Sequence, residues 1–316
     1  MQTLLMGKTN LDVFAETLLS LAQQDRNILA VTTDSRGSGR LVKYGETLPD
    51  QIVEIGIAEQ NMVGISAGLA STGKHVFAVA PACFLVARAV EQIKNDVVYS
   101  DQPVKLIGIS AGVSYGSLGF THHSTHDLAT LLALYNLDIV VPVDNAETRA
   151  VIKAAVNYPR PLYIRFGKKA MPLLTPEDKP IEIGKANILA RGSEVVFIGN
   201  GETVLPAWQA RELLEAQGVS TGVISMHTLR PLDRAVLLEA AASAKVLITC
   251  EEHSVNGGLG SLCASILMQE NIYTPMRIFG FPDEPIVTGN QTEIFNHYGI
   301  SAQGLADTAL SLLHSR

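Results

Sequence analysis

Val53-Glu-Ile-Gly-Ile-Ala-Glu-Gln-Asn-Met62, followed by Val63-Gly-Ile-Ser-Ala-Gly-Leu-Ala70, decides how the first half of this chain folds. A short apolar strand passes here into a helix that begins at Glu59 and is rich in glycine and alanine. Small residues such as Gly64 and Ala67 let another helix approach closely. A carboxylate at such a contact is suited to share a proton with a nitrogen heterocycle. The simpler interpretation of Glu59 is an acid favoured by the helix dipole.

Buried strands and helices alternate on both sides of this stretch. We expect strands at 28–31, 53–55, 75–78, 104–109, 139–141 and 162–164, and helices at 11–22, 59–71, 85–99, 127–134 and 146–157. Continuously apolar strands that alternate with helices indicate a parallel sheet with both faces covered.

A proline-containing stretch, KKAMPLLTPEDKPIEIGK, interrupts this alternation at 168–185 and is typical of an interdomain linker. Beyond it we expect strands at 195–198, 220–225, 245–249 and 276–279, and helices at 207–217, 235–242, 259–269 and from 302. The predicted fold class is α/β, with two doubly wound domains, the second smaller and open-sheeted. The predicted boundaries are 1–168 for the first domain, 169–186 for the linker and 187–316 for the second domain.

Composition narrows the class of protein. The 316 residues carry a net charge of −7, and this argues against a nucleic-acid binder, which needs a basic face. Cys83, Cys250 and Cys263 are widely separated in the sequence, a pattern typical of reduced cytoplasmic thiols. No apolar stretch approaches the ~20 residues needed to cross a bilayer. The N-terminal sequence lacks the pattern of a signal peptide. We therefore expect a cytoplasmic protein with no membrane partner. A hydrophobic content of 47% suggests surface buried against other subunits.

The string around Glu59 resembles the pyrimidine-binding domain of the transketolase family. The resemblance implies that Glu59 is catalytic and binds the aminopyrimidine ring of thiamine diphosphate, a proton relay that must be held rigidly and away from water. The stretch 77–93 is similar to the segment that packs on this ring. By position Phe84 stacks on the ring, and Arg88 and Gln60 are further cofactor-binding candidates. Plain core packing is the other interpretation of Phe84.

A histidine-rich loop, Ser110-Ala-Gly-Val-Ser-Tyr-Gly-Ser-Leu-Gly-Phe-Thr-His-His-Ser-Thr-His126, follows a predicted strand, where open α/β sheets place ligand loops. Its histidines, at 122, 123 and 126, suggest a metal site as one alternative, but no glutamate lies between them as in metalloproteases. The transketolase family carries a similar loop whose histidine lines the substrate channel. By resemblance His122 is catalytic and contacts substrate, and His123 is the next candidate. We predict no metal ligands in this chain.

Several positions bear on the substrate. Arg36, in the loop Asp34-Ser-Arg-Gly-Ser-Gly39, and Arg165, at a strand end with Lys168, are candidate contacts for a substrate anion. Ser110 aligns with a histidine of the family and is a further substrate candidate. Leu118 replaces an acid that the family uses to bind a sugar hydroxyl. These departures suggest an unusual anionic sugar, carrying phosphate or sulfonate, and the sequence does not identify it.

The second domain contains a partial dinucleotide fingerprint, Gly199-Asn-Gly-Glu-Thr-Val204. Val204 replaces its third glycine, and no acid follows the next strand, so we interpret the motif as a tight turn. The later stretches Thr228-Leu-Arg-Pro-Leu-Asp233 and Glu251-Glu-His-Ser-Val-Asn-Gly-Gly-Leu-Gly260 resemble the transketolase C-terminal domain.

One expected element is missing. The family holds Mg²⁺ and the diphosphate with a Gly-Asp-Gly segment, and no such segment occurs in this chain. The resemblance covers the C-terminal half to three-fifths of a full-length transketolase. The missing domain is either a separate N-terminal subunit, which gives an α2β2 assembly, or absent from a non-catalytic remnant. Retention of Glu59, Phe84 and His122 favours the separate subunit.

The sequence therefore predicts the C-terminal subunit of a two-chain transketolase, inactive without its partner, that moves a two-carbon ketol unit from an anionic ketose to an aldose. The β-subunit of a 2-oxoacid dehydrogenase is one alternative. A deoxyxylulose-phosphate synthase is another, although that enzyme is a single long chain. A regulatory or NAD-binding Rossmann-like subunit is the alternative from another class.

Overall fold

Seven strands in the order β12-β6-β7-β5-β4-β2-β3 form the larger sheet of the computed structural model, which describes residues 4–314. The strands are β2 (Ile28–Thr32), β3 (Ile52–Glu54), β4 (His75–Pro81), β5 (Lys105–Ile109), β6 (Asp138–Val140), β7 (Leu162–Arg165) and β12 (Thr228–Arg230). The strands from β2 to β7 pair in parallel, as the alternation predicted. The ligand loops therefore leave one edge of the sheet, at the carboxyl ends of the strands.

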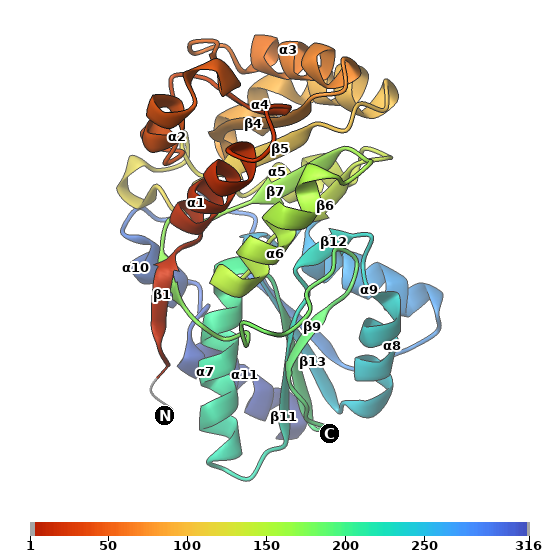
Figure 1. Ribbon diagram of the computed structural model, residues 1–316. Helices are drawn as coiled ribbons and strands as arrows, with labels where there is room; N and C mark the ends of the chain where they lie inside the picture. Colours follow the sequence, from red (N-terminus) through yellow and green to blue (C-terminus); the bar gives the residue numbers. More distant parts are fainter. Residues whose placement is uncertain (1–3, 315–316) are drawn as a thin grey trace.

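Helices cover both faces of this sheet (Figure 1). On one face α1 (Asn10–Ala22) and α6 (Asn145–Val156) bury residues such as Phe14 and Ile152, with α2 (Val42–Thr47) nearby. On the other face lie α3 (Glu59–Ser71), α4 (Ala82–Gln92) and α5 (Asp127–Leu132). Thr9 and Asp144 accept backbone N–H groups at the starts of α1 and α6, which fixes where these helices begin.

The prediction of a single helix at 85–99 is wrong in one respect. The backbone at Ala89 leaves the helical region, with φ −113° and ψ 18°, and α4 continues after this kink into a π-helical segment, η2 (Ile93–Tyr99). Insertions of this kind often occur at functional sites. Here the kink directly follows Arg88.

The second half forms a five-stranded sheet in the order β14-β13-β10-β11-β9. Its strands are β9 (Asn187–Ala190), β10 (Val195–Gly199), β11 (Thr221–Ser225), β13 (Val246–Ser254) and β14 (Met276–Phe281). Its helices are α7 (Val204–Glu215), α8 (Arg234–Ser243), α9 (Leu259–Gln269), α10 (Gln291–His297) and α11 (Ala302–His314). α7 and α11 cover one face, and α8 and α9 cover the other (Figure 1). This is the smaller open sheet that the sequence predicted, with β9 as an antiparallel addition.

The two units are joined in two ways. Strand β12 follows β11 in the chain but pairs antiparallel with β6 of the first sheet. One apolar cluster runs from Met62 and Leu85 in the first unit to Val196 and Leu247 in the second. Near the N-terminus β1 (Met6–Thr9) pairs with β8 (Ala170–Pro172), which lies in the stretch predicted as the linker. Along residues 4–314 no helix is both long enough and apolar enough to span a bilayer.

Candidate active site

Glu59 is the first residue of α3, at the point where the chain leaves β3. Its side chain is 3% exposed. It lies on a surface cavity of about 380 Å³ that Ile57, Ala58, Gln60 and Arg88 also line. A buried carboxylate beside an open cavity can be reached by a ligand while protein covers the rest of it. Gln60 lies on the exposed side of the same turn.

Arg88 links Glu59 to Phe84. Its Nη1 atom donates to both carboxylate oxygens of Glu59 at 2.9 Å. Its Cζ atom lies 4.1 Å from the centroid of the Phe84 ring, within the range of a cation–π contact. The guanidinium is thus a flat group that stacks on Phe84 and donates N–H to Glu59 at the same time. Three of the four cofactor-binding candidates, Glu59 from one stretch of sequence and Phe84 and Arg88 from another, thus form one cluster.

His122 extends this cluster along the histidine-rich loop. Its ring packs edge-on against Phe84, with centroids 5.3 Å apart, and against Tyr115, with centroids 5.5 Å apart. Nδ1 of His122 hydrogen-bonds Thr121 Oγ1 at 3.0 Å, which leaves Nε2 as the other ring nitrogen. His122 is half-buried and is therefore accessible to a ligand that stacks on Phe84.

The other two histidines of the loop lie in different environments. His123 is buried, and its Nε2 lies 2.9 Å from Gly116 O. Burial lowers the pKa of His123, so this ring is neutral and holds the loop together. His126 is exposed, at the start of α5. The three rings do not converge, and within residues 4–314 no group of three or more His, Cys, Asp or Glu side chains is placed to hold a metal ion.

Tyr115 and Lys168 complete the cluster, and Tyr115 was not singled out from the sequence. Lys168 Nζ lies 4.6 Å from the Tyr115 ring centroid. Burial raises the pKa of Tyr115, and the hydroxyls of Ser110 and Ser38 oppose this effect. Ser110 is fully buried with φ +53°. An aromatic residue in a glycine-rich loop was the available sequence signal.

Arg36 is turned toward β3. Its Nε donates to Glu54 Oε2 at 3.2 Å, while Glu54 Oε1 accepts the backbone N–H groups of Asp34 and Gly56. Glu54 therefore anchors the loop predicted to bind an anion. The loop reaches the cluster through Ser38, not through the guanidinium of Arg36.

Arg165 lies inside the protein, in contrast to the exposed anion contact that its place at a strand end suggested. It is 3% exposed, and its Nε donates to Asp127 Oδ2 at 2.8 Å. Its Nη2 donates to the backbone oxygens of Ser124 and Glu252. Tyr163 also donates to Asp127. This buried network ties the end of the histidine-rich loop to β7 and β13.

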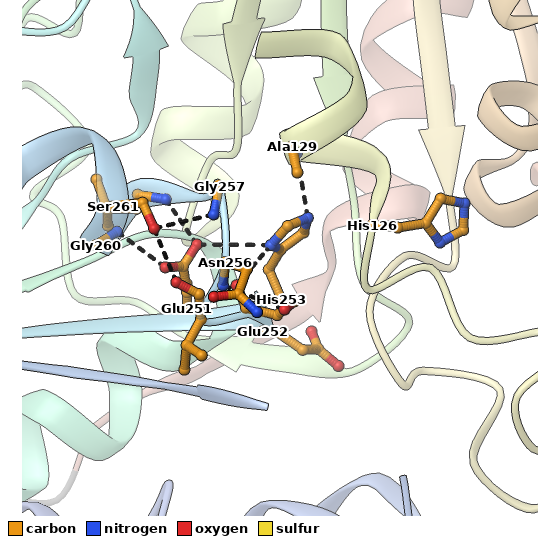
Figure 2. Close-up of polar contacts among 12 residues, drawn as sticks. His126, Ala129, Glu251, Glu252, His253, Asn256, Gly257, Gly260 and Ser261 are labelled. Carbon is orange, nitrogen blue, oxygen red and sulfur yellow. Dashed lines mark hydrogen bonds and ion pairs between the residues drawn. The ribbon is translucent and has the colours of Figure 1, made fainter. Parts of the chain in front are cut away.

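Figure 2 shows the adjacent part of β13, where Glu251, Glu252 and His253 lie side by side and His126 lies apart. Glu251 accepts the N–H groups of Leu259 and Gly260 at the start of α9. Burial raises the pKa of Glu251 to about 7. Ala129 N donates to His253 Nε2 at 3.3 Å, and burial lowers the pKa of His253 to about 4. His253 is therefore a neutral acceptor in the interface between the two units.

The glycine-rich turn of the second unit faces the first unit. Gly201 has φ +53°, and its N–H donates to Val141 O at 3.1 Å. Glu202 accepts the N–H of Lys169. The turn that imitates a dinucleotide fingerprint is thus occupied by contacts within the chain.

Comparison with known proteins identifies both units. Residues 7–172 match the family described as "Transketolase, pyrimidine binding domain", and residues 184–305 match "Transketolase, C-terminal domain". The chain belongs to the transketolase family.

Two transketolase subunits and one solved structure are similar along nearly the whole chain. A subunit of the apulose-4-phosphate transketolase of Phocaeicola vulgatus is 47% identical over 95% of this chain and 96% of its own length. "6-deoxy-6-sulfo-D-fructose transketolase subunit SqwH" of Clostridium sp. (strain MSTE9) is 30% identical over 94% of this chain and 92% of its own length. A structure described as "Split gene transketolase, inactive beta4 tetramer" is 32% identical, with a TM-score of 0.87 over 98% of this chain and 99% of its own.

These relatives place the chain among the subunits of split transketolases, as the sequence predicted. They also confirm the α/β fold class with its two transketolase domains. Enzymes of this family are transferases, and membership implies thiamine diphosphate as cofactor.

Apolar side chains are exposed at the cavity and on the histidine-rich loop. Ile57 lines the cavity and is 74% exposed, and Leu118 and Phe120 on the loop are 54% and 75% exposed. They lie close in sequence to Glu59 or to His122. Exposed apolar side chains around a polar cavity are typical of a surface that another protein covers.

Proposed function

We propose that this chain is the C-terminal subunit of a two-chain transketolase that transfers a two-carbon ketol unit from an anionic ketose to an aldose. The observation that supports this most directly is the buried Glu59 carboxylate, which lines an open cavity and is linked through Arg88 to the ring of Phe84. The assembly is α2β2, cytoplasmic and active in carbohydrate metabolism.

The residues of the cavity fit an aminopyrimidine ring. Arg88 already stacks a flat group on Phe84 and brings N–H to Glu59, and a flat heterocycle with ring and exocyclic nitrogens can take up the same two contacts. When bound, thiamine diphosphate supplies the nucleophilic carbon that takes up the two-carbon unit. Glu59 holds and returns the proton at the pyrimidine nitrogen, within a site that the partner shields from water. We assign the Mg²⁺ and diphosphate ligands to that partner.

Other residues of the cluster face the substrate in this proposal. His122 lies next to Phe84 and donates a hydrogen bond to a sugar oxygen or moves a proton. Lys168 is exposed beside Tyr115 and attracts the substrate anion. We prefer Lys168 to Arg165 for this role because Arg165 is buried and paired with Asp127. Gln60 contacts the cofactor from the exposed side of the cavity. His123 acts indirectly, by holding the loop in place, and Ser110 lies near the Tyr115 hydroxyl.

The names of the relatives suggest two donors. Because the relative at 47% identity is named for apulose-4-phosphate, we propose a phosphorylated ketose, with apulose-4-phosphate as the first candidate. The relative named for 6-deoxy-6-sulfo-D-fructose makes a sulfonated ketose the second candidate. A donor assay that offers both compounds at equal concentration separates the two.

The proposal is tested by mixing this chain with a candidate N-terminal subunit, thiamine diphosphate and Mg²⁺, and measuring ketol transfer. We expect no turnover by the chain alone. Replacement of Glu59 by glutamine (Glu59→Gln) lowers kcat about 10²- to 10⁴-fold because the proton relay is lost. Glu91→Gln, at an exposed position on α4, is the matched control and retains activity. Turnover by the chain alone, or full activity of Glu59→Gln, contradicts the proposal.

A further inference from the structure

Two buried glutamates of the second unit reach through gaps left by glycines of the first unit. Glu202 follows β10, and Glu252 lies on β13. A Cβ atom on Gly167 would lie 1.9 Å from Glu202 Oε1, and one on Gly112 would lie 2.2 Å from the carboxyl carbon of Glu252. No side chain fits at either glycine while the glutamate stays in place.

Each glutamate holds one backbone N–H group next to the candidate active site. Glu252 Oε1 accepts from Val113 N at 2.9 Å. Glu202 Oε1 accepts from Lys169 N at 3.0 Å. Val113 opens the turn that carries Tyr115, and Lys169 directly follows Lys168. The two carboxylates therefore fix the two chain segments that meet where Lys168 covers the Tyr115 ring.

One amide group connects the two glutamates. Gln291 Nε2, at the start of α10, donates to Glu202 Oε2 at 2.6 Å and to Glu252 Oε1 at 2.8 Å. Its position is fixed because α10 begins with a capping box formed by Asn290 and Glu293. The α10 side chains Ile294 and Phe295 also pack in one apolar cluster with Val113.

Buried carboxylates this close repel each other unless a donor or a proton lies between them. Burial, and then the charge of Glu202, raises the pKa of Glu252 to about 8. Gln291 supplies one N–H to each carboxyl group, and the Arg165 guanidinium opposes their charge from the other side. Without Gln291 both largely buried carboxyl groups lose a hydrogen-bond donor, which favours rearrangement of the side chains.

We propose that Gln291 is a positioning residue for ketol transfer. Through Glu202 and Glu252 it holds the histidine-rich loop and the Lys168 segment in the arrangement that binds the substrate anion. We call these three side chains the interdomain clamp. The inference rests on the proposed function for its link to catalysis, but the ordering of the two segments can be measured without it.

The first test is hydrogen exchange on the isolated full chain. Gln291→Met keeps the length of the side chain and removes the donor. We expect peptides that cover 110–126 and 166–173 to exchange about tenfold faster in this variant, with no change in α3. Thr292→Val is the matched control because it removes an exposed hydrogen bond from Lys169 Nζ to the same helix and leaves the clamp intact. Equal exchange in the two variants, or faster exchange throughout the second unit, overturns the proposal.

Glu252→Gln covers the case in which Gln291→Met does not fold. Its amide oxygen can replace Oε1 as acceptor for Val113 and Gln291, so we expect protection of 110–126 to stay within about twofold of the parent chain. A loss of protection at 110–126 well beyond twofold in Glu252→Gln contradicts an arrangement set by these hydrogen bonds.

The second test uses the mixed two-chain enzyme. In Gln291→Met we expect the KM of the anionic donor to rise about tenfold, while the Kd of thiamine diphosphate stays within about twofold. A purely structural defect lowers both affinities together and overturns the positioning role. If the parent enzyme transfers no ketol unit from any donor, the proposed function fails, and the exchange experiment still decides whether the clamp orders the two segments.

Discussion

Arg88, Glu59 and Phe84 are in direct contact, and the charge of Glu59 is neutralised by Arg88, which is partly exposed. Glu59 is almost fully buried, while the Arg88 side chain is 46% exposed. Water screens the pair on the Arg88 side, which limits how much the ion pair stabilises the chain. The planar guanidinium adds a stacking contact that a lysine at this position cannot reproduce.

We expect Arg88→Met to lower the free energy of unfolding by about 1 kcal/mol, because Glu59 loses its cation and Phe84 loses a stacked group. In a double-mutant cycle with Glu59→Gln, the coupling energy is on the order of 1 kcal/mol. Arg88→Lys recovers only part of it. Urea unfolding of the parent chain and these variants measures these values, and additive effects of Arg88→Met and Glu59→Gln contradict a direct pair.

At the scale of single residues, the sequence indicated which residues belong to the candidate site. It did not indicate which way their side chains point. Glu59, Phe84 and His122 were selected from three separate stretches, and the structure brings them to one cluster, where their roles stay predictions. Arg165 was a candidate contact for a substrate anion because it ends a strand. Its burial follows from coverage by β13, a strand almost ninety residues later, and no local pattern indicates such a contact.

The histidine-rich loop depends on glycines for different reasons. Gly112 has φ +61° and lies against Glu252, whereas Gly119 has φ +71° and meets only Thr288 Oγ1 at 3.7 Å. Both backbones favour glycine, but only Gly112 also lacks room for a side chain.

We expect Gly112→Ala to lower the free energy of unfolding by about 3 kcal/mol, since backbone strain adds to the displacement of a buried carboxyl group. Gly119→Ala lowers it by about 1–2 kcal/mol from backbone strain alone, because ψ of −163° places this residue in a region essentially reserved for glycine. Denaturant unfolding compares the two variants directly. Similar losses at both positions show that the close approach of Glu252 does not matter.

Most elements were predictable because hydrophobic periodicity marks them clearly. The predicted helix at 59–71 coincides with α3, and the strand at 28–31 differs from β2 by one residue. The kink at Ala89 was not predictable, because the residues around it keep a helical pattern. Short elements such as β8 and α10 were missed because they have too few residues to show a period.

On the scale of the whole molecule, buried acids connect the two units. Glu147 on α6 accepts hydrogen bonds from Asn187 Nδ2 and Ser225 Oγ of the second unit. Burial, and then the charge of Asp144, raises the pKa of Glu147 to about 7 from its ordinary value of 4.5. A raised pKa means that the folded chain binds the proton more tightly, so the stabilisation is complete below about pH 4.5 and is lost as the pH rises through about 7.

Glu147→Gln removes this dependence. The Asn187 amide can rotate to accept from the new NH₂ group, since its Oδ1 has no hydrogen-bond partner among the described residues. Between pH 5.5 and 8 we expect the variant to gain about 2 kcal/mol in unfolding free energy relative to the parent chain. Unfolding curves at the two pH values test this, and a constant difference contradicts the assigned titration.

Strand β12 shows the limit of sequence interpretation at this scale. The two-domain arrangement follows from the break in alternation at 168–185, and the exact boundaries stay a prediction. A three-residue strand that leaves the second unit to pair with β6 carries no periodic signal. Its pairing and the shared apolar cluster lead us to expect that the two units unfold together.

The exposed apolar side chains of Ile57, Leu118 and Phe120 bear on how a cell must produce such a chain. If a second polypeptide covers them, every copy made in excess presents them to other proteins. Unmatched copies would then either associate with one another or be recognised by chaperones and proteases that bind exposed apolar segments. We therefore expect selection for balanced synthesis of the two polypeptides. The amount of the partner then sets the lifetime of this chain.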